Sequence, residues 1–177
     1  SADMRVLVAL SGGVDSAVAA LLLARAPGVS ALAAVHMANW DAADEERGGY
    51  AAPACAHDGD WRSAEKTASV LGVPLTRVSL AGAYWAAVFR PALDAYAAGR
   101  TPNPDVACNA AVKFGALWDW ARERGFERLA TGHYARIVGG RVAAALDATR
   151  DQSYFLSTLS PEQIAAALFP LGEVTKE

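Results

Sequence analysis

The chain has 177 residues, a net charge of −3 at pH 7, and 53% hydrophobic against 20% charged side chains. This length suits one α/β domain with a complete core and excludes two large domains, so we treat residues 1–177 as a single domain. No apolar run approaches the ~20 residues that a membrane span needs, and the weak negative charge is not that of a general nucleic-acid binder, so we expect a soluble protein without a membrane partner.

The first predicted elements are a strand, a glycine-containing loop and a helix. Apolar residues 6–10 predict a buried strand and residues 17–26 predict a helix, with Ser11-Gly12-Gly13-Val14-Asp15-Ser16 between them. In such a unit, backbone N–H groups and the helix N-terminus face an anion, so the loop predicts a phosphate site. A carboxylate such as Asp15 fits beside a polyanion only if a divalent cation lies between them. The alternative is a glycine turn that merely joins the strand to the helix.

The same loop lacks the lysine of the GxxxxGK[ST] loop, which argues against transfer of a γ-phosphoryl group. Residues 30–37 and 74–80 then predict two further strands, and residues 61–71 and 84–99 predict two helices. Residues 38–60 predict a long loop. Alternating strands and helices predict a parallel sheet with helices on both faces. Met37, at the carboxyl end of the second strand, is either a wall for an adenine ring or a core methionine.

Two prolines stiffen residues 101–109, which present Asp105 and Cys108. A helix is predicted from about Asn109 to Glu123, and it would place Cys108 beside a helix N-terminus, where the dipole stabilises a thiolate. Cys108 is therefore either a nucleophile or a small buried apolar residue.

The last third of the chain predicts a short strand, a hairpin and a final helix. The strand spans residues 127–130, and Gly132 and His133 follow at its carboxyl end, although a lone histidine is more often structural. Residues 135–138 and 142–145 predict the two strands of the hairpin. Ser160 and Pro161 predict the cap and first position of the helix.

The two cysteines, Cys55 and Cys108, form no CxxC pair, so this chain alone cannot build a zinc knuckle or an iron–sulfur ligand set. Without a secretion signal, a reducing compartment is the default expectation. We expect a cytoplasmic protein, and the alternative is a mitochondrial or plastid protein whose transit peptide has been removed.

Seven blocks of sequence resemble, in order, the tRNA-specific 2-thiouridylase family of the ATP pyrophosphatase (PP-loop) superfamily. They are SGGVDS at 11–16, NWD at 39–41, AGRTPNPDVACN at 98–109, KF at 113–114, TGHYAR at 131–136, RDQSYFLSTLS at 150–160 and FPLGE at 169–173. The resemblance implies a doubly wound, mostly parallel α/β sheet of the adenine nucleotide alpha hydrolase type. It also implies conversion of the C2 oxygen of a tRNA wobble uridine to sulfur, with ATP, Mg²⁺ and a persulfide donor protein.

The same resemblance implies a role for particular residues. ATP would be bound by Ala9, Leu10, Ser11, Gly12, Gly13, Val14, Asp15, Ser16, Met37 and Gly132, with Asp15 as the metal ligand. Cys108 would be the catalytic cysteine and Asp105 the neighbouring catalytic acid. tRNA would be contacted by Asn103, Pro104, Asp105, His133, Arg150, Asp151 and Gln152.

The family pattern also includes a second cysteine that carries the persulfide, and further domains that grip tRNA, which these 177 residues do not contain. We therefore expect this chain to bind ATP and to adenylate the base without completing thiolation. Two other functions stay open. Another AMP-forming PP-loop synthetase would share the first loop but would not need Asp105 and Cys108, and a catalytically silent module would only bind nucleotide or RNA.

Overall fold

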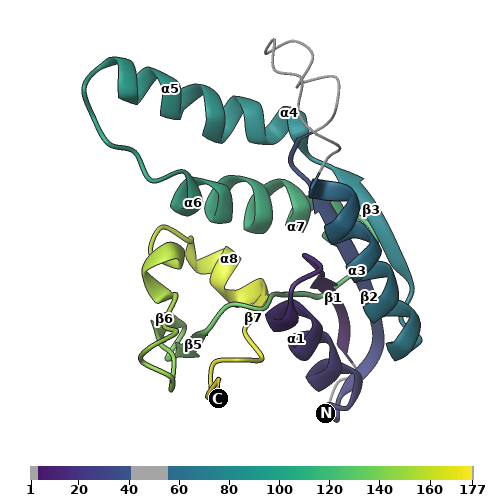
Figure 1. The fold of residues 1–177 in the computed structure, drawn as a ribbon. Helices are drawn as coiled ribbons and strands as arrows, with labels where there is room; N and C mark the ends of the chain where they lie inside the picture. The colour runs from purple at the N-terminus through teal and green to yellow at the C-terminus, as the bar shows by residue number, and fades with distance from the viewer. Residues whose placement is uncertain (1–3, 41–55, 177) are drawn as a thin grey trace.

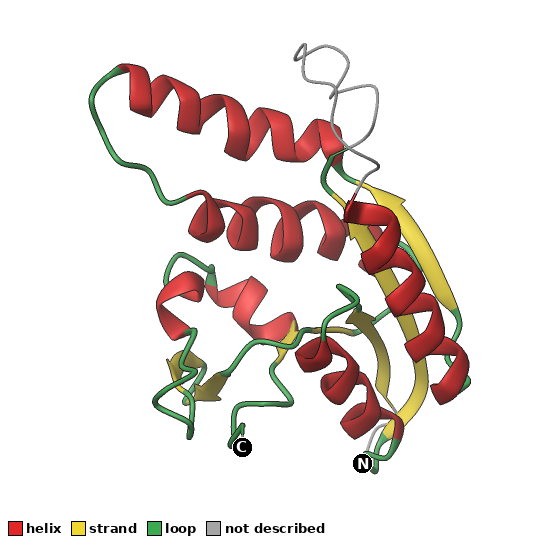
Figure 2. Cartoon of the chain, viewed as in Figure 1, coloured by secondary structure: helices red, strands yellow, loops and turns green. Residues whose placement is uncertain are grey.

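The computed structural model of the chain describes residues 4–40 and 56–176. Its main element is a sheet with the strand order β3-β2-β1-β4-β7, in which every neighbouring pair is parallel. The strands are β1 (Met4–Ala9), β2 (Val29–Ala38), β3 (Leu75–Ser79), β4 (Arg128–Ala130) and β7 (Ala167–Leu168). Helices cover both faces of the sheet (Figures 1 and 2), so the predicted doubly wound α/β fold is confirmed.

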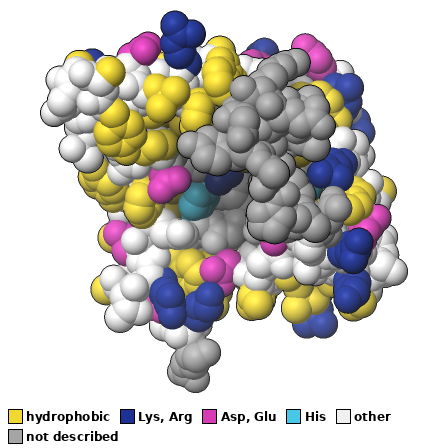
Figure 3. Space-filling view, turned by 45° about the horizontal axis from the view of Figure 1, so that its top comes forward, with side chains coloured by type: hydrophobic (Ala, Val, Ile, Leu, Met, Phe, Trp, Pro, Cys, Tyr) yellow, Lys and Arg dark blue, Asp and Glu magenta, His cyan; other side chains and the backbone are white. Residues whose placement is uncertain are grey.

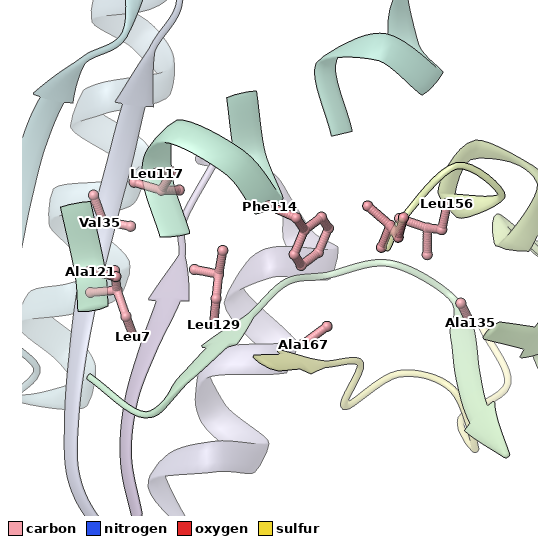
Figure 4. Close-up of a cluster of buried hydrophobic side chains, with 10 residues drawn as sticks. Leu7, Val35, Phe114, Leu117, Ala121, Leu129, Ala135, Leu156 and Ala167 are labelled. Atoms are coloured by element: carbon pink, nitrogen blue, oxygen red, sulfur yellow. The ribbon is translucent and has the colours of Figure 1, made fainter. Parts of the chain in front are cut away.

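Alternate residues of β1 are buried against opposite layers. Val6 and Val8 pack in the cluster that includes side chains of α1 (Val14–Ala24) and α3 (Ala56–Leu71). Leu7 packs on the other face, in the cluster drawn in Figure 4. A strand buried on both faces needs a continuous apolar run, which is why residues 6–10 carry no polar side chain.

The second layer contains a long helical run made of α6 (Pro104–Ala107), η2 (Cys108–Ala116) and α7 (Leu117–Arg122). The run begins at Pro104 and not near Asn109, so the predicted start was wrong. The physical reason is a cap: Asn103 Oδ1 accepts hydrogen bonds from the backbone N–H groups of Asp105 (3.1 Å) and Val106 (3.3 Å). Pro104 takes the first helical position, where its missing N–H costs nothing.

The other predicted elements are present, with shifted ends. The helix expected over 84–99 is a run of α4 (Ala81–Tyr84), η1 (Trp85–Phe89) and α5 (Arg90–Ala97), so Pro91 lies well inside it. The hairpin consists of β5 (Ala135–Val138) and β6 (Arg141–Ala144), and η3 (Ser153–Leu156) precedes α8 (Pro161–Ala166). Ser160 caps α8 as expected, in a capping box with Gln163. Strand β7 was not predicted.

Two sequence-based predictions, those for Cys55 and for most of the loop 38–60, lie outside the described residues. Within residues 4–40 and 56–176, no helix has both the length and the apolar character that crossing a bilayer requires.

The strand order places a ligand crevice at a defined point of the sheet. After β1 the chain adds β2 and then β3 on one side, whereas β4 pairs with the other side of β1. In open α/β sheets, ligands bind outside the carboxyl ends of the strands where the order reverses in this way. Residues 10–13 after β1 and residues 131–134 after β4 therefore face one crevice.

Candidate active site

The loop after β1 is held by its own serines. The Ser16 hydroxyl donates a hydrogen bond to the Gly13 carbonyl oxygen (2.9 Å), and the Ser11 backbone N–H donates to Ser16 Oγ (3.2 Å). Gly13 is the N-cap of α1 and supplies no side-chain cap. The cap therefore offers no side chain to the first N–H groups of this helix, which is the arrangement that a phosphate site at a helix N-terminus requires.

Gly12 is required where α3 approaches the loop. Its φ is +90°, and a Cβ at this position would lie 2.9 Å from the Cα of Asp60. Gly132 is required for a similar reason, because its Cβ would lie 2.7 Å from the backbone nitrogen of Ser16. The two glycines therefore let α3 and the end of β4 pack directly against the phosphate loop.

Asp15 lies in the first turn of α1 and is paired with a lysine from the far end of the chain. Its Oδ1 accepts hydrogen bonds from Lys176 Nζ (2.6 Å) and the Tyr134 hydroxyl (3.4 Å). The Lys176 backbone N–H donates to Asp147 Oδ2 (3.0 Å), which fixes this segment, and that bond is the main reason why the pKa of Asp147 is lowered. No sequence pattern pointed to Lys176.

A magnesium site made by protein side chains alone is not visible in the part of the chain that the structure describes, where no three His, Cys, Asp or Glu side chains gather. Mg²⁺ usually needs only one or two carboxylates when substrate phosphates and water supply its remaining ligands. Asp15 alone therefore fits a magnesium ion that arrives with the nucleotide.

A cavity of about 410 Å³ opens in the crevice between the loop after β1 and the end of β4. Nine residues singled out from the sequence line it, namely Ala9, Leu10, Ser11, Asp15, Ser16, Met37, Gly132, His133 and Gln152. Six further lining residues were not assigned to a site from the sequence, namely Val35, His36, Asn39, Asp60, Lys113 and Thr131. Gly12, Gly13 and Val14 are not among the lining residues, and Val14 is 70% exposed.

His36 positions the start of the phosphate loop. The side chain is buried, and its Nδ1 hydrogen-bonds to the carbonyl oxygen of Leu10 (2.8 Å). A histidine in the middle of an apolar strand was the available signal, since a buried polar side chain needs a hydrogen-bond partner.

A second cavity, of about 240 Å³, adjoins the first. It is lined by Asp105, Cys108, Asn109, Lys113, His133, Gln152 and Phe155. Lys113, His133 and Gln152 line both cavities. Figure 3 shows this face of the molecule hollowed near its centre, with a histidine beside acidic and basic side chains. Cys108 thus lines a cavity that adjoins the one lined by the loop after β1.

The electrostatics of Cys108 differ from the expectation. Since the helix begins at Pro104, Cys108 lies in its second turn, and the dipole effect is confined to the first. Burial raises the pKa of the Cys108 thiol, Lys113 opposes this rise, and Asp105 adds to it. Asn39 Nδ2 also lies 3.8 Å from Cys108 Sγ and favours the thiolate. The prediction that the helix N-terminus prepares a thiolate is therefore wrong.

His133 is neutral at physiological pH. Burial, and secondly the charge of Lys113, lower the pKa of its imidazole to about 3. Its Nδ1 lies 2.7 Å from Thr131 Oγ1, so the ring is held in one orientation. His133 therefore presents a neutral ring to both cavities.

Residues 4–177 match the family model described as "tRNA methyl transferase HUP domain". The chain belongs to this family. This HUP domain is also similar to proteins named "tRNA-specific 2-thiouridylase MnmA", as the seven sequence blocks indicated. Thus the family description names methyl transfer, while the relatives are named for thiolation.

One relative, from Bacillus licheniformis, is 44% identical over 178 residues, which is 98% of this chain and 46% of the relative. Another, from Xanthomonas campestris pv. campestris (strain B100), is 46% identical over 176 residues, 97% of this chain and 44% of the relative. The HUP domain thus spans less than half the length of these relatives. A solved U34-tRNA thiolase, NcsA from Methanococcus maripaludis with its [4Fe-4S] cluster, covers 99% of this chain and 54% of its own at 20% identity, and its TM-score of 0.58 supports the fold alone.

The remaining predicted tRNA contacts of the HUP domain do not line either cavity. Asn103 and Pro104 form the helix start described above. Asp151 accepts hydrogen bonds from the backbone N–H groups of Ala145 (2.9 Å) and Ser153 (3.3 Å), so it closes a turn. Arg150 is exposed next to it. Their contacts with tRNA stay predictions.

Proposed function

We propose that this domain binds ATP and activates the C2 oxygen of a tRNA wobble uridine, so that sulfur can replace it. One observation carries the proposal. An anion site built by a lysine-free glycine loop and a cysteine on a neighbouring helix line adjoining cavities, which share Lys113, His133 and Gln152. The names of the relatives support the same substrate.

ATP would lie along the larger cavity. The β- and γ-phosphates would lie at the N-terminus of α1, where the Gly13 cap supplies no side chain to the first N–H groups. Asp15 would be the protein ligand of a magnesium ion held mainly by the phosphates. The adenine ring would lie against Met37, which lines the cavity at the carboxyl end of β2.

The reaction follows from the weakness of uracil C2 as an electrophile. In our proposal the C2 oxygen attacks the α-phosphorus of ATP, the bond from this phosphorus to the bridging oxygen breaks, and pyrophosphate leaves with the electron pair. The proton of uracil N3 passes to Asp105 and then to water. The C2 oxygen thereby becomes part of an AMP ester, which is a far better leaving group than oxide.

Sulfur then replaces AMP at C2. The terminal sulfur of a persulfide on a donor protein forms the new bond, and AMP leaves with the electrons of the C2–O bond. The thiolate of Cys108 attacks the donor sulfur and breaks its bond to the transferred sulfur, which yields 2-thiouridine and a disulfide that a small thiol reduces. To enter the cavity, the wobble uracil must leave the stacked bases of the anticodon loop.

The test separates activation from sulfur transfer. The chain is incubated with ATP, Mg²⁺, tRNA and a persulfide donor, and pyrophosphate and 2-thiouridine are measured separately. We expect tRNA-dependent pyrophosphate release from the wild type and from Cys108→Ser, but not from Asp15→Asn. In a longer protein that contains this domain and forms 2-thiouridine, Cys108→Ser should abolish the formation of 2-thiouridine.

The competing functions give other results. A silent binding module would bind ATP without releasing pyrophosphate, and this result would sink the proposal. An AMP-forming synthetase acting on another substrate would release pyrophosphate without tRNA. Retained thiolation in Cys108→Ser would remove the cysteine from the mechanism.

A further inference from the structure

Lys113 lies at the junction of the two cavities. Among the described residues that line them, it is the only lysine or arginine. The neighbouring His133 is neutral, because the pKa of its ring is lowered to about 3. The positive charge at this junction therefore comes from one side chain.

The helix that carries Lys113 has an unusual form that explains this position. In an α-helix, residues five apart point about 140° away from each other. Segment η2 is a wide, π-type helix in which the backbone hydrogen bonds span one more residue, so Cys108 and Lys113 turn toward the same side. Gly115 permits the wide turn, since a Cβ there would lie 3.0 Å from the Ala110 carbonyl oxygen.

Hydrogen bonds fix the ammonium group. Lys113 Nζ donates to Asn109 Oδ1 (3.0 Å), and Asn109 Nδ2 donates to the Phe155 carbonyl oxygen (3.0 Å). Burial lowers the pKa of Lys113, while Cys108 and Asp105 oppose this shift by favouring the charged form. A phosphate group would favour the charged form further. The ammonium group of Lys113 is thus held by Asn109 and partly removed from water. Among the described residues, no carboxylate forms a hydrogen bond with it.

The proposed position of ATP indicates which of its phosphates would contact the Lys113 ammonium group. If pyrophosphate lies at the N-terminus of α1 and the uracil enters beside Cys108, the phosphorus that bonds to both must lie between the two cavities. That phosphorus is the α-phosphorus. Negative charge on its oxygens must be stabilised as the C2 oxygen attacks, and a fixed cation in a partly desolvated site does this most effectively.

We propose that Lys113 is a catalytic residue whose ammonium group contacts the α-phosphate during adenylyl transfer. This inference rests on the proposed function. The bonds that form and break are those of the activation step above, and Lys113 keeps its proton throughout. After AMP has left, the same charge remains beside Cys108 and favours its thiolate.

Binding measurements test the contact directly. Kd values for ATP, AMP and pyrophosphate are measured by calorimetry for the wild type, Lys113→Met and Lys113→Arg, with exposed Lys66→Met on α3 as the matched control. Lys113→Met should raise the Kd for ATP and for AMP by roughly 10- to 100-fold, which is the range for loss of a hydrogen bond to a charged group. The Kd for pyrophosphate should change by no more than about twofold. Lys113→Arg should recover part of the loss, and Lys66→Met should match the wild type.

A second measurement follows the thiol and needs no nucleotide. In a Cys55→Ser background, the rate of Cys108 alkylation by iodoacetamide is measured against pH. Lys113→Met should shift the midpoint to higher pH, because it removes the charge that opposes the raised pKa. If Lys113→Met does not fold, Lys113→Gln and Lys113→Arg are compared in the same two assays.

The outcomes separate this inference from the proposed function. A wild type that binds no ATP would contradict the proposed function itself. If the wild type binds ATP but a folded Lys113→Met binds AMP equally well, the contact with the α-phosphate is wrong. An equal loss of affinity for pyrophosphate would place Lys113 at the leaving group and would also overturn the inference.

Discussion

The phosphate loop (residues 11–16) and the cysteine helix (residues 104–122, which carry Cys108) line adjoining cavities, but they are built in different ways. The loop consists of consecutive residues, and the hydrogen bonds among its serines and Gly13 join positions at most five residues apart, as between Ser11 and Ser16. The surroundings of Cys108 combine residues from distant segments, such as Asn39, which is 69 positions away. The comparison teaches that a site made by local backbone can be recognised in a sequence, whereas a site made by tertiary packing needs the structure.

The largest expected effect comes from breaking the loop through its packing. A Gly132→Val side chain would begin 2.7 Å from the Ser16 nitrogen, so the start of α1 must move. We expect a loss of about 3 kcal/mol in the free energy of unfolding, together with loss of ATP binding. Urea denaturation and calorimetry measure the two effects. Gly82→Ala in α4 is the control, since a Cβ there meets nothing within 4 Å. Unchanged ATP affinity in Gly132→Val would show that the loop tolerates displacement.

The junction between the two regions can be examined through pH. The pKa of His133 is about 3 in the folded protein against a reference of 6.5, so only the unfolded chain takes up a proton between these values. The stabilising effect is complete above pH 6.5 and is lost as the pH falls toward 3. The wild type should lose up to about 1.4 kcal/mol per pH unit more than His133→Gln below pH 6.5. Parallel urea titrations at pH 7, 6 and 5 measure this, and identical slopes would contradict it.

Lys176 sharpens the comparison, because it joins a distant segment to the loop through Asp15, as Tyr134 also does. Its ammonium group lies 2.6 Å from Asp15 Oδ1, beside the proposed phosphates. Lys176→Ala should lower the affinity for ATP and for pyrophosphate by roughly tenfold, and the affinity for AMP by less. Lys176→Arg should retain most of the wild-type affinity. Calorimetry with each ligand measures this. Tighter binding of ATP by Lys176→Ala would mean instead that the lysine competes with magnesium for Asp15.

The smallest expected effect concerns the start of the cysteine helix. Asn103→Ala removes the cap that holds the N–H groups of Asp105 and Val106, at a cost of about 1 kcal/mol in unfolding free energy. Asn103→Asp keeps the cap and should be nearly as stable as the wild type. Thermal denaturation compares the two variants. If Asn103→Asp nevertheless binds tRNA as weakly as Asn103→Ala, the side-chain amide itself contacts RNA.

The sequence was sufficient for most of the fold because its strands and helices follow simple patterns. The apolar run 6–10 and the alternation of elements predicted a parallel sheet, and the hairpin was correctly placed at residues 135–145. Strand β7 escaped prediction because two residues, Ala167 and Leu168, are too short to show a period. The early start of α6 could have been predicted, since Asn103 and Pro104 form a typical cap and first helical position.

The loop after β1 was predictable because its residues are neighbours in sequence. Ser11, Asp15 and Ser16, which the loop pattern singled out, line the larger cavity. The roles of His36 and Lys176 depend on hydrogen bonds to Leu10 and Asp15, which no local pattern encodes. The wide helix η2 was also invisible, because its apolar residues do not distinguish a π-type turn from an α-helix. The surroundings of Cys108 therefore differed from those expected.

The pairing of Asp15 with Lys176 joins residues that are 161 positions apart. A chain emerges from the ribosome N-terminus first, so the loop at residues 11–16 emerges long before Lys176, and this contact cannot form until Lys176 has followed. Nascent chains that stall before Lys176 would lack this contact although they already contain all of β1 and α1. This contact at the proposed phosphate site can therefore form only after Lys176 has been synthesised.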